Sequence, residues 1–212
     1  MSKEKLANLE VGQCLGRGVQ SQVYKGYDLI NKRDVAIKKR VNIKGAQQEV
    51  KIMKKYGQHP YLPKLYDYFT YKNRAYIVME HVDGKPLGRG RKVEKKSEED
   101  AVEITINVLK GLGHLHTHNI LHVDTLPKNV MLLPGNNVKI IDFGFSFEKG
   151  IEGLYKGERK HKRVTGKPPE LREQILLLDD TTDIYAAAYL CVSLLNGQQP
   201  KWDKKNGNMY LT

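Results

Sequence analysis

The chain has 212 residues, with 36 Lys and Arg against 24 Asp and Glu, and its formal net charge is +12 at pH 7. This length can bury a hydrophobic core as one large domain or two small lobes without disulfide support. Cys14 and Cys191 match no metal-ligand or redox spacing, so we expect buried thiols in a reducing compartment. The N-terminus is charged and the longest apolar run is too short to cross a bilayer, so we expect neither a signal peptide nor a membrane span.

The N-terminal part of the chain reads as strands with one helix. Runs rich in Val, Ile and Tyr at 10–18, 21–29 and 33–41 are separated by turn residues, which predicts an antiparallel meander. A helix is expected over 45–57, where Val50 and Met53 recur at helical spacing and Gly57 supplies a stop. The segment 64–80 then predicts two strands around a Lys-Asn turn.

The sequence pattern changes from mostly strand-like to mostly helical at "HVDGKPLG", which we interpret as a boundary between domains 1–82 and 83–212. A long helix should begin after Ser97 as N-cap, with Asp100 as its capping-box partner, and should run to "HTHN". Its expected buried face, at spacings of three and four, is Ala101, Ile104, Val108, Leu112 and Leu115. "VMLLPGNNVKIIDFG" predicts a hairpin, and "TDIYAAAYLCVSLLNG" predicts a buried helix closed by Gly197.

Two motifs in the N-terminal part suggest phosphate chemistry. Gly16 and Gly18 in "LGRGVQSQV" allow backbone amides to approach phosphates, but tight hairpins use the same residues, so this signal is weak alone. "VAIK" then places Lys38 on an apolar strand, where an unpaired buried charge costs about 3 to 5 kcal/mol. Glu49 is the only acid between Arg40 and the end of the following helix, so it is the expected partner of Lys38.

Oxygen-bearing side chains follow in "HVDTLPKNV" and "IIDFG". Asp124 and Asn129 lie in a loop after the long helix, and Asp142 ends a predicted strand. Such hard oxygens suit Mg²⁺ carrying a nucleotide triphosphate. The glycine loop, the lysine, the acid and these two motifs occur in one order and on the expected elements, which makes chance agreement very small.

With these motifs the chain resembles the eukaryotic-type serine/threonine protein kinases, including their bacterial members, from Gly16 to Gly197. The resemblance implies an α+β bilobal fold with an antiparallel N-lobe sheet plus one helix and a truncated, mainly helical C-lobe, which binds ATP with Mg²⁺ or Mn²⁺. The implied nucleotide-binding residues, with Met79 as gatekeeper, are Gly16, Gly18, Ser21, Val23, Ala36, Lys38, Glu49, Glu80 and Val82. The implied catalytic loop has Asp124 as proton acceptor, Asn129 and Asp142 as metal ligands, Asp183 as an anchor, and Glu170 closing the activation segment.

The sequence departs from the family at three points. Val123 replaces the arginine that receives an activation-loop phosphate, so Ser146, Tyr155 or Thr165 should not switch activity in the usual way. Leu126 replaces a lysine aimed at the γ-phosphate, a loss of up to about 4 kcal/mol at an effective dielectric constant of about 20. Lys128 lies where tyrosine kinases carry an arginine, and we expect it to restore part of that loss. The sequence also stops soon after "LLNGQQPKW", and the helix expected after the domain boundary looks stunted.

The expected function is therefore an ATP-dependent protein kinase that modifies a protein hydroxyl, with serine and threonine favoured over tyrosine. Two alternatives remain: a pseudokinase that serves as a binding module, and a small-molecule phosphotransferase of the aminoglycoside or choline kinase type, which shares the H-x-D-x-x-x-x-N loop. The basic segments 84–96 and 156–163 are either solvated loops or a docking surface for an anionic activator or partner. A partner or a second copy of the chain is expected to cover the base of the central helix, and the expected location is cytoplasmic, or a host cell reached by delivery.

Overall fold

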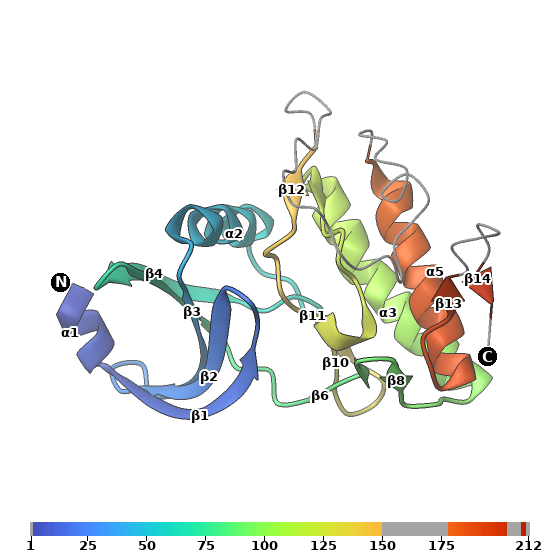
Figure 1. Cartoon of the computed structure of the whole chain (residues 1–212), viewed down its shortest axis with the longest axis horizontal. Coiled ribbons are helices and arrows are strands. Elements are labelled where there is room, and N and C mark those ends of the chain that lie inside the picture. Colours follow the sequence, from blue (N-terminus) through green and yellow to red (C-terminus); the bar gives the residue numbers. More distant parts are fainter. Residues whose placement is uncertain (1, 150–177, 203–208, 211–212) are drawn as a thin grey trace. The chain divides into compact units, whose positions relative to one another are not determined.

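The computed structural model describes residues 2–149, 178–202 and 209–210, which form an α+β fold (Figure 1). The chain divides into two compact units, Met1–Asp83 and Gly84–Thr212. Among the described elements, the first unit holds the five-stranded antiparallel sheet and the second holds the two longest helices. None of the described helices has both the length and the hydropathy of a membrane-spanning segment.

The N-terminal unit is a five-stranded antiparallel sheet with the order β1-β2-β3-β5-β4. Its strands are β1 (Leu9–Arg17), β2 (Ser21–Asp28), β3 (Arg33–Arg40), β4 (Leu65–Tyr71) and β5 (Arg74–Glu80). The expected meander is confirmed for β1 to β3, and the expected hairpin for β4 and β5, whose turn residues Lys72 and Asn73 have φ angles of 45° and 55°. The hairpin enters the sheet through its second strand, which leaves β4 at the edge.

Two helices accompany this sheet. A short helix that the sequence analysis missed, α1 (Ser2–Ala7), contacts β4 and β1. The expected helix is α2 (Ile43–Tyr56), which lies against β4 and β5 (Figure 1). Asn42 caps its first turn by accepting a hydrogen bond from Gly45 N, and Gly57 ends it with a φ of 71°, as predicted. The helix therefore begins two residues before the predicted start, because the Asn42 cap satisfies an amide of the first turn.

The C-terminal unit is built on α3 (Glu98–Thr117), which packs against α5 (Asp180–Asn196). Ser97 caps α3 by accepting from Asp100 N at 3.1 Å, as predicted, while the Asp100 carboxylate accepts from Asn136 Nδ2. The five residues of the predicted apolar face are all buried, with at most 1% of their surface exposed. Gly197 ends α5 in the left-handed region, also as predicted.

Short strands complete this unit. The predicted hairpin is confirmed as β10 (Val130–Leu132) paired with β11 (Val138–Ile140), and β6 (Lys85–Pro86) pairs with β10 on its other side. The remaining strands are β7 (Gly88–Arg89), β8 (Lys92–Val93), β9 (Ile120–Leu121), β12 (Phe147–Glu148), β13 (Lys201–Trp202) and β14 (Met209–Tyr210), and the turn η1 (Pro127–Asn129) precedes β10.

Three expectations about this architecture were wrong. Segment 84–96 contains the strands β6, β7 and β8 and no stunted helix, because three glycines and a proline disfavour helix there. The helix α5 is buried on one side only, since Ile184, Val192 and Leu195 are 51%, 39% and 39% exposed. Neither cysteine is fully buried, since Cys14 is exposed on β1 at the edge of the sheet and Cys191 on α5 is half-buried.

Candidate functional site

In the N-terminal unit, Lys38 lies on β3, between Val23 of β2 and Ile77 of β5 in the strand register. Its Nζ lies 2.6 Å from Oε1 of Glu49 on α2, and only 5% and 1% of the two side chains are exposed. The pairing expected from the sequence is thus confirmed. Ala36, two residues earlier on the same strand, is 8% exposed and faces Met79 in the register.

Sequence reasoning missed that Arg40 shares this carboxylate. Its Nη1 lies 2.6 Å from Oε2 of Glu49, and the same atom donates to the carbonyl oxygen of Gly45 at 3.2 Å. Side chains two residues apart on a strand point to the same face, so the spacing of Lys38 and Arg40 was the signal that could have found it. Glu49 therefore holds two buried cations and not one.

The glycine loop forms the connection between β1 and β2. Gly18 N donates to Ser21 O at 2.8 Å, and a Cβ added at Gly18 would lie 3.3 Å from Ser21 Oγ. A Cβ at Gly16 would meet nothing within 4 Å. Of these two glycines, Gly18 is sterically constrained by its described neighbours, whereas the space beside Gly16 is open to a ligand.

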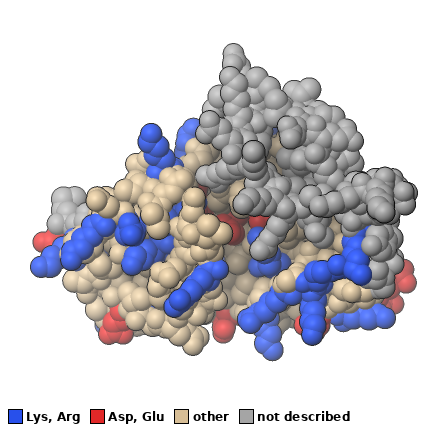
Figure 2. Space-filling model, viewed as in Figure 1, with Lys and Arg blue, Asp and Glu red and all other residues tan. Residues whose placement is uncertain are grey.

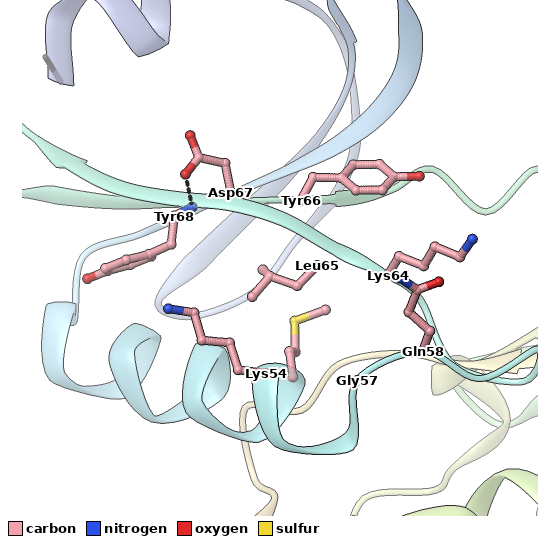
Figure 3. Close-up of a pocket in the computed structure, with 9 residues that line it drawn as sticks. Lys54, Gly57, Gln58, Lys64, Leu65, Tyr66, Asp67 and Tyr68 are labelled. Atoms are coloured by element: carbon pink, nitrogen blue, oxygen red, sulfur yellow. Dashed lines mark hydrogen bonds between the residues drawn. The ribbon is translucent and has the colours of Figure 1, made fainter. Parts of the chain in front are cut away.

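Glu80 and Val82, expected to read adenine, lie at and just beyond the end of β5. Glu80 N donates to Lys64 O at 2.9 Å, and Glu80 Oε2 accepts from Lys64 N at 3.1 Å. These bonds tie the end of β5 to the start of β4. A cavity of about 440 Å³ lies elsewhere in this unit, between the end of α2 and β4 (Figure 3), and none of the expected site residues lines it.

In the C-terminal unit, Asp183 of α5 anchors the segment that begins at His122. Its Oδ2 accepts from His122 N at 2.8 Å, and its Oδ1 accepts from Val123 N at 2.7 Å. His116 Nε2 lies 3.0 Å from Oδ2, and Asp183 is fully buried. The expected anchoring contact is confirmed. The hydrogen bond from Val123 N to Asp183 offsets backbone strain, because a β-branched residue at a φ of 68° is strained by about 1 to 2 kcal/mol.

The carboxylate of Asp124 is oriented by two donors. Asn129 Nδ2 lies 2.7 Å and Lys128 Nζ 2.8 Å from its Oδ2, and Asn129 Nδ2 also bonds the Asp124 carbonyl oxygen at 2.8 Å. Asn129 is 5% exposed, whereas 40% of the Lys128 side chain is exposed. Asp124, Lys128 and Asn129, which the sequence analysis singled out, therefore form one hydrogen-bonded group.

Asn129 and Asp142 are tied together through the backbone, since Ile141 N donates to Asn129 O at 2.8 Å. The Asn129 amide nitrogen is engaged by Asp124, so its side-chain oxygen is the atom that can coordinate a cation. One carboxylate and one amide oxygen fit Mg²⁺ or Mn²⁺. Within the described residues no cluster of three or more His, Cys, Asp or Glu side chains could hold a metal, so these two residues would need further ligands such as phosphate oxygens.

His122, two residues before Asp124, is completely buried, and burial lowers its pKa below the usual value of 6.5. Its Nδ1 pairs with Thr125 Oγ1 at 3.0 Å, and its ring meets Phe143 edge-on. Ser146 is also buried, 3% exposed, and its Oγ donates to the His122 carbonyl oxygen at 3.3 Å. The other two candidate phosphorylation sites, Tyr155 and Thr165, and the closing Glu170 lie outside the described residues.

Comparisons with known proteins agree with these motifs. The protein kinase domain model matches residues 9–211. The chain is 30% identical over 217 residues to a probable myosin light chain kinase of Dictyostelium discoideum, covering 96% of this chain and 66% of that protein. It is 29% identical over 211 residues to the serine/threonine-protein kinase PLK4 of Drosophila virilis, covering 93% of this chain and 26% of that protein. The chain thus spans between about a quarter and two thirds of these relatives, and it belongs to the protein kinase family.

Proposed function

We propose that the chain is an ATP-dependent protein kinase that transfers the γ-phosphate to a protein hydroxyl, with serine and threonine favoured and tyrosine possible. The observation that carries the proposal is the Asp124 carboxylate, fixed by Asn129 and Lys128 on a backbone held by Asp183. A carboxylate placed in this way can accept the proton of a hydroxyl that attacks phosphorus. The name of the Drosophila virilis relative, a serine/threonine-protein kinase, supports the serine/threonine preference.

In the proposed reaction the substrate oxygen attacks the γ-phosphorus and its proton passes to Asp124. The bond from the γ-phosphorus to the bridging oxygen breaks, and ADP leaves. Asn129 and Asp142 would hold Mg²⁺ or Mn²⁺, which neutralises charge on the phosphates when bound. Lys128, beside Asp124, would place a positive charge close to the transferred phosphoryl group.

The residues of the N-terminal unit take the nucleotide roles in this proposal. Lys38, held by Glu49, would contact the α- and β-phosphates, and the open space beside Gly16 would admit them. The backbone at Glu80 and Val82 would receive adenine, with Val23 and Ala36 beside it. The chemistry of the side chains supports these roles, because a buried lysine keeps its charge when a carboxylate is paired with it.

We further propose that activation-loop phosphorylation does not control the enzyme. Val123 offers no charge to a phosphate, and Ser146 is buried and hydrogen-bonded. The combined variant Ser146→Ala, Tyr155→Phe and Thr165→Ala should retain activity. Loss of activity with an intact fold, checked by circular dichroism and thermal unfolding, would contradict this.

The proposed function is tested by transfer of labelled γ-phosphate, with Mg²⁺ or Mn²⁺, to the protein itself and to a generic acceptor protein. We expect transfer by the wild type and none by Asp142→Ala, while Glu99→Gln, which removes an exposed acid from α3, should match the wild type. ATP binding without any transfer would favour the binding-module alternative. Transfer to an aminoglycoside or choline and to no protein would favour a small-molecule phosphotransferase.

A further inference from the structure

Residues 84–96 of the C-terminal unit, called the basic hairpin below, contain the paired strands β7 and β8. Gly88 pairs with Val93 and Arg89 with Lys92, and Gly90 makes the turn with a φ of 60°. The sequence "GKPLGRGRKVEKK" has six basic residues and one acid, Glu94, whose carboxylate bonds Lys96 at 2.8 Å. The exposed basic residues of the hairpin are Lys85, Arg89, Arg91, Lys92 and Lys95.

The hairpin is held by the last turn of α5 and by the segment that follows it. Gln199 Nε2 donates to Gly90 O at 2.5 Å, and Gln199 N donates to Arg91 O at 3.0 Å. Val93 N bonds Gly197 O at 3.2 Å, and Lys96 N bonds Leu194 O at 3.0 Å. The exposed cations are therefore attached to a backbone that is hydrogen-bonded to the rest of the unit, unlike those of a solvated loop.

The same hairpin packs against η1, the turn that follows Asp124. Leu87 N donates to Val130 O at 2.9 Å, and a Cβ added at Gly88 would lie 2.9 Å from Pro127 Cβ. Only Thr125 and Leu126 separate Asp124 from Pro127 in the chain. Figure 2 shows blue side chains gathered at the lower right, where Figure 1 draws β6 to β8.

We propose that this hairpin binds acidic side chains that flank the target hydroxyl in a protein substrate. The proposal rests on the proposed function, in which that hydroxyl lies at Asp124. An extended peptide advances about 3.3 Å per residue, so carboxylates a few residues from the hydroxyl reach cations beside η1. At physiological ionic strength charges interact within about 8 Å, which limits the effect to such near residues.

The hairpin favours a protein over other anionic partners. It contains no aromatic residue on which a nucleic acid base could stack. Its larger apolar residues, Leu87 and Val93, are 2% and 7% exposed, so no apolar side chain of this size is free to insert into a lipid surface. An acidic peptide needs only the charged and hydrogen-bonding groups that the hairpin presents.

The test compares two acceptor peptides that share one serine, flanked by glutamates in one and by glutamines in the other. Phosphoryl transfer (kcat/KM) and binding of the fluorescent peptides are measured for the wild type, for Arg89→Ala with Lys92→Ala, and for Lys51→Ala with Lys110→Ala. The last variant removes the same charge from the exposed faces of α2 and α3. An exposed ion pair is worth a factor of about 1.4 to 5, so the hairpin variant should lose about 2- to 25-fold of the preference for the glutamate peptide.

We expect this loss in the hairpin variant only, with the glutamine peptide unaffected and the preference of the wild type reduced by salt. Equal affinity of the wild type for both peptides, or equal losses in the two variants, would overturn the proposal. Preferential binding that depends on the hairpin, without any transfer, would refute the kinase reaction and leave the acidic-peptide surface standing. Hairpin-dependent binding of RNA or of phosphatidylserine vesicles, with no peptide preference, would assign the surface to another partner and also overturn it.

Discussion

The double pairing of Glu49 makes a specific prediction about stability. Replacing Glu49 by Gln leaves Lys38 and Arg40 buried, 5% and 7% exposed, beside a neutral amide. Breaking a buried pair by removing one partner costs about 3 to 5 kcal/mol. We expect a loss of that size in the free energy of unfolding of Glu49→Gln.

Replacing Arg40 by Leu is expected to cost less. Glu49 keeps Lys38 at 2.6 Å, while its Oε2 and the Gly45 carbonyl oxygen each lose the Arg40 donor. An unsatisfied buried group costs about 1 to 3 kcal/mol, and the repulsion between the two cations disappears. The expected loss is therefore about 1 to 3 kcal/mol.

Urea unfolding of the single variants and of Glu49→Gln with Arg40→Leu gives the coupling between the two residues. We expect a coupling of at least about 1 kcal/mol, since the residues are in direct contact. Arg74→Leu serves as the control, because Arg74 is only half-buried and its Nη1 donates to the backbone oxygen of Asn73; it should change stability by less than Arg40→Leu does. Additive losses, or a smaller loss for Glu49→Gln than for Arg40→Leu, would refute the shared pairing.

Three further predictions follow from buried contacts. Asp183→Asn offers one acceptor oxygen where two backbone amides donate, so it should lower the free energy of unfolding by about 1 to 3 kcal/mol and reduce kcat; unchanged urea midpoints would contradict the anchoring role. Gly26→Ala places a Cβ 2.5 Å from Ile37 Cδ1 and 2.8 Å from Glu10 O, and it should destabilise the fold by about 1 to 3 kcal/mol. Gly113→Ala lies on the helix α3, where the added Cβ meets nothing within 4 Å, and it should stabilise the fold by about 1 kcal/mol. Thermal unfolding would show whether both signs are correct. Burial lowers the pKa of His122, so as the pH falls the unfolded chain binds a proton near pH 6.5, before the folded chain does. The stability that comes from neutral His122 is therefore complete above pH 6.5 and falls below it, by at most about 1.4 kcal/mol per pH unit. His122→Asn should remove this part of the pH dependence, measured by urea unfolding at pH 5.5 and 7.5.

Most of the elements that were predicted correctly from the sequence are marked by residues close to one another in the chain. Ser97, Gly57 and Gly197 mark helix ends through bonds and backbone angles within a few residues, and these were predicted correctly. The pairing of Lys38 with Glu49 was also accessible, because a buried lysine requires an acid and the local sequence offered one.

The remaining features depend on contacts between distant segments. The hairpin at 84–96 is held by Gln199 and Gly197, more than a hundred residues away, so its composition alone suggested a stunted helix or a loop. The placement of β5 between β3 and β4 has the same origin, since strand order is not encoded within either strand. The contact of Arg40 with Glu49 was not predicted, because the buried charge of Lys38 requires an acid but does not require a second cation.

The role of Asp124 as proton acceptor is tested most directly by measuring ATP binding and phosphoryl transfer separately in Asp124→Asn. This variant keeps the shape of the side chain and loses the acceptor for the hydroxyl proton, with Glu99→Gln as the control. ATP affinity and single-turnover transfer to an acceptor protein would be measured on the same samples. We expect unchanged ATP affinity and a transfer rate lower by about 10² to 10⁴-fold. Transfer by Asp124→Asn at the wild-type rate would contradict it.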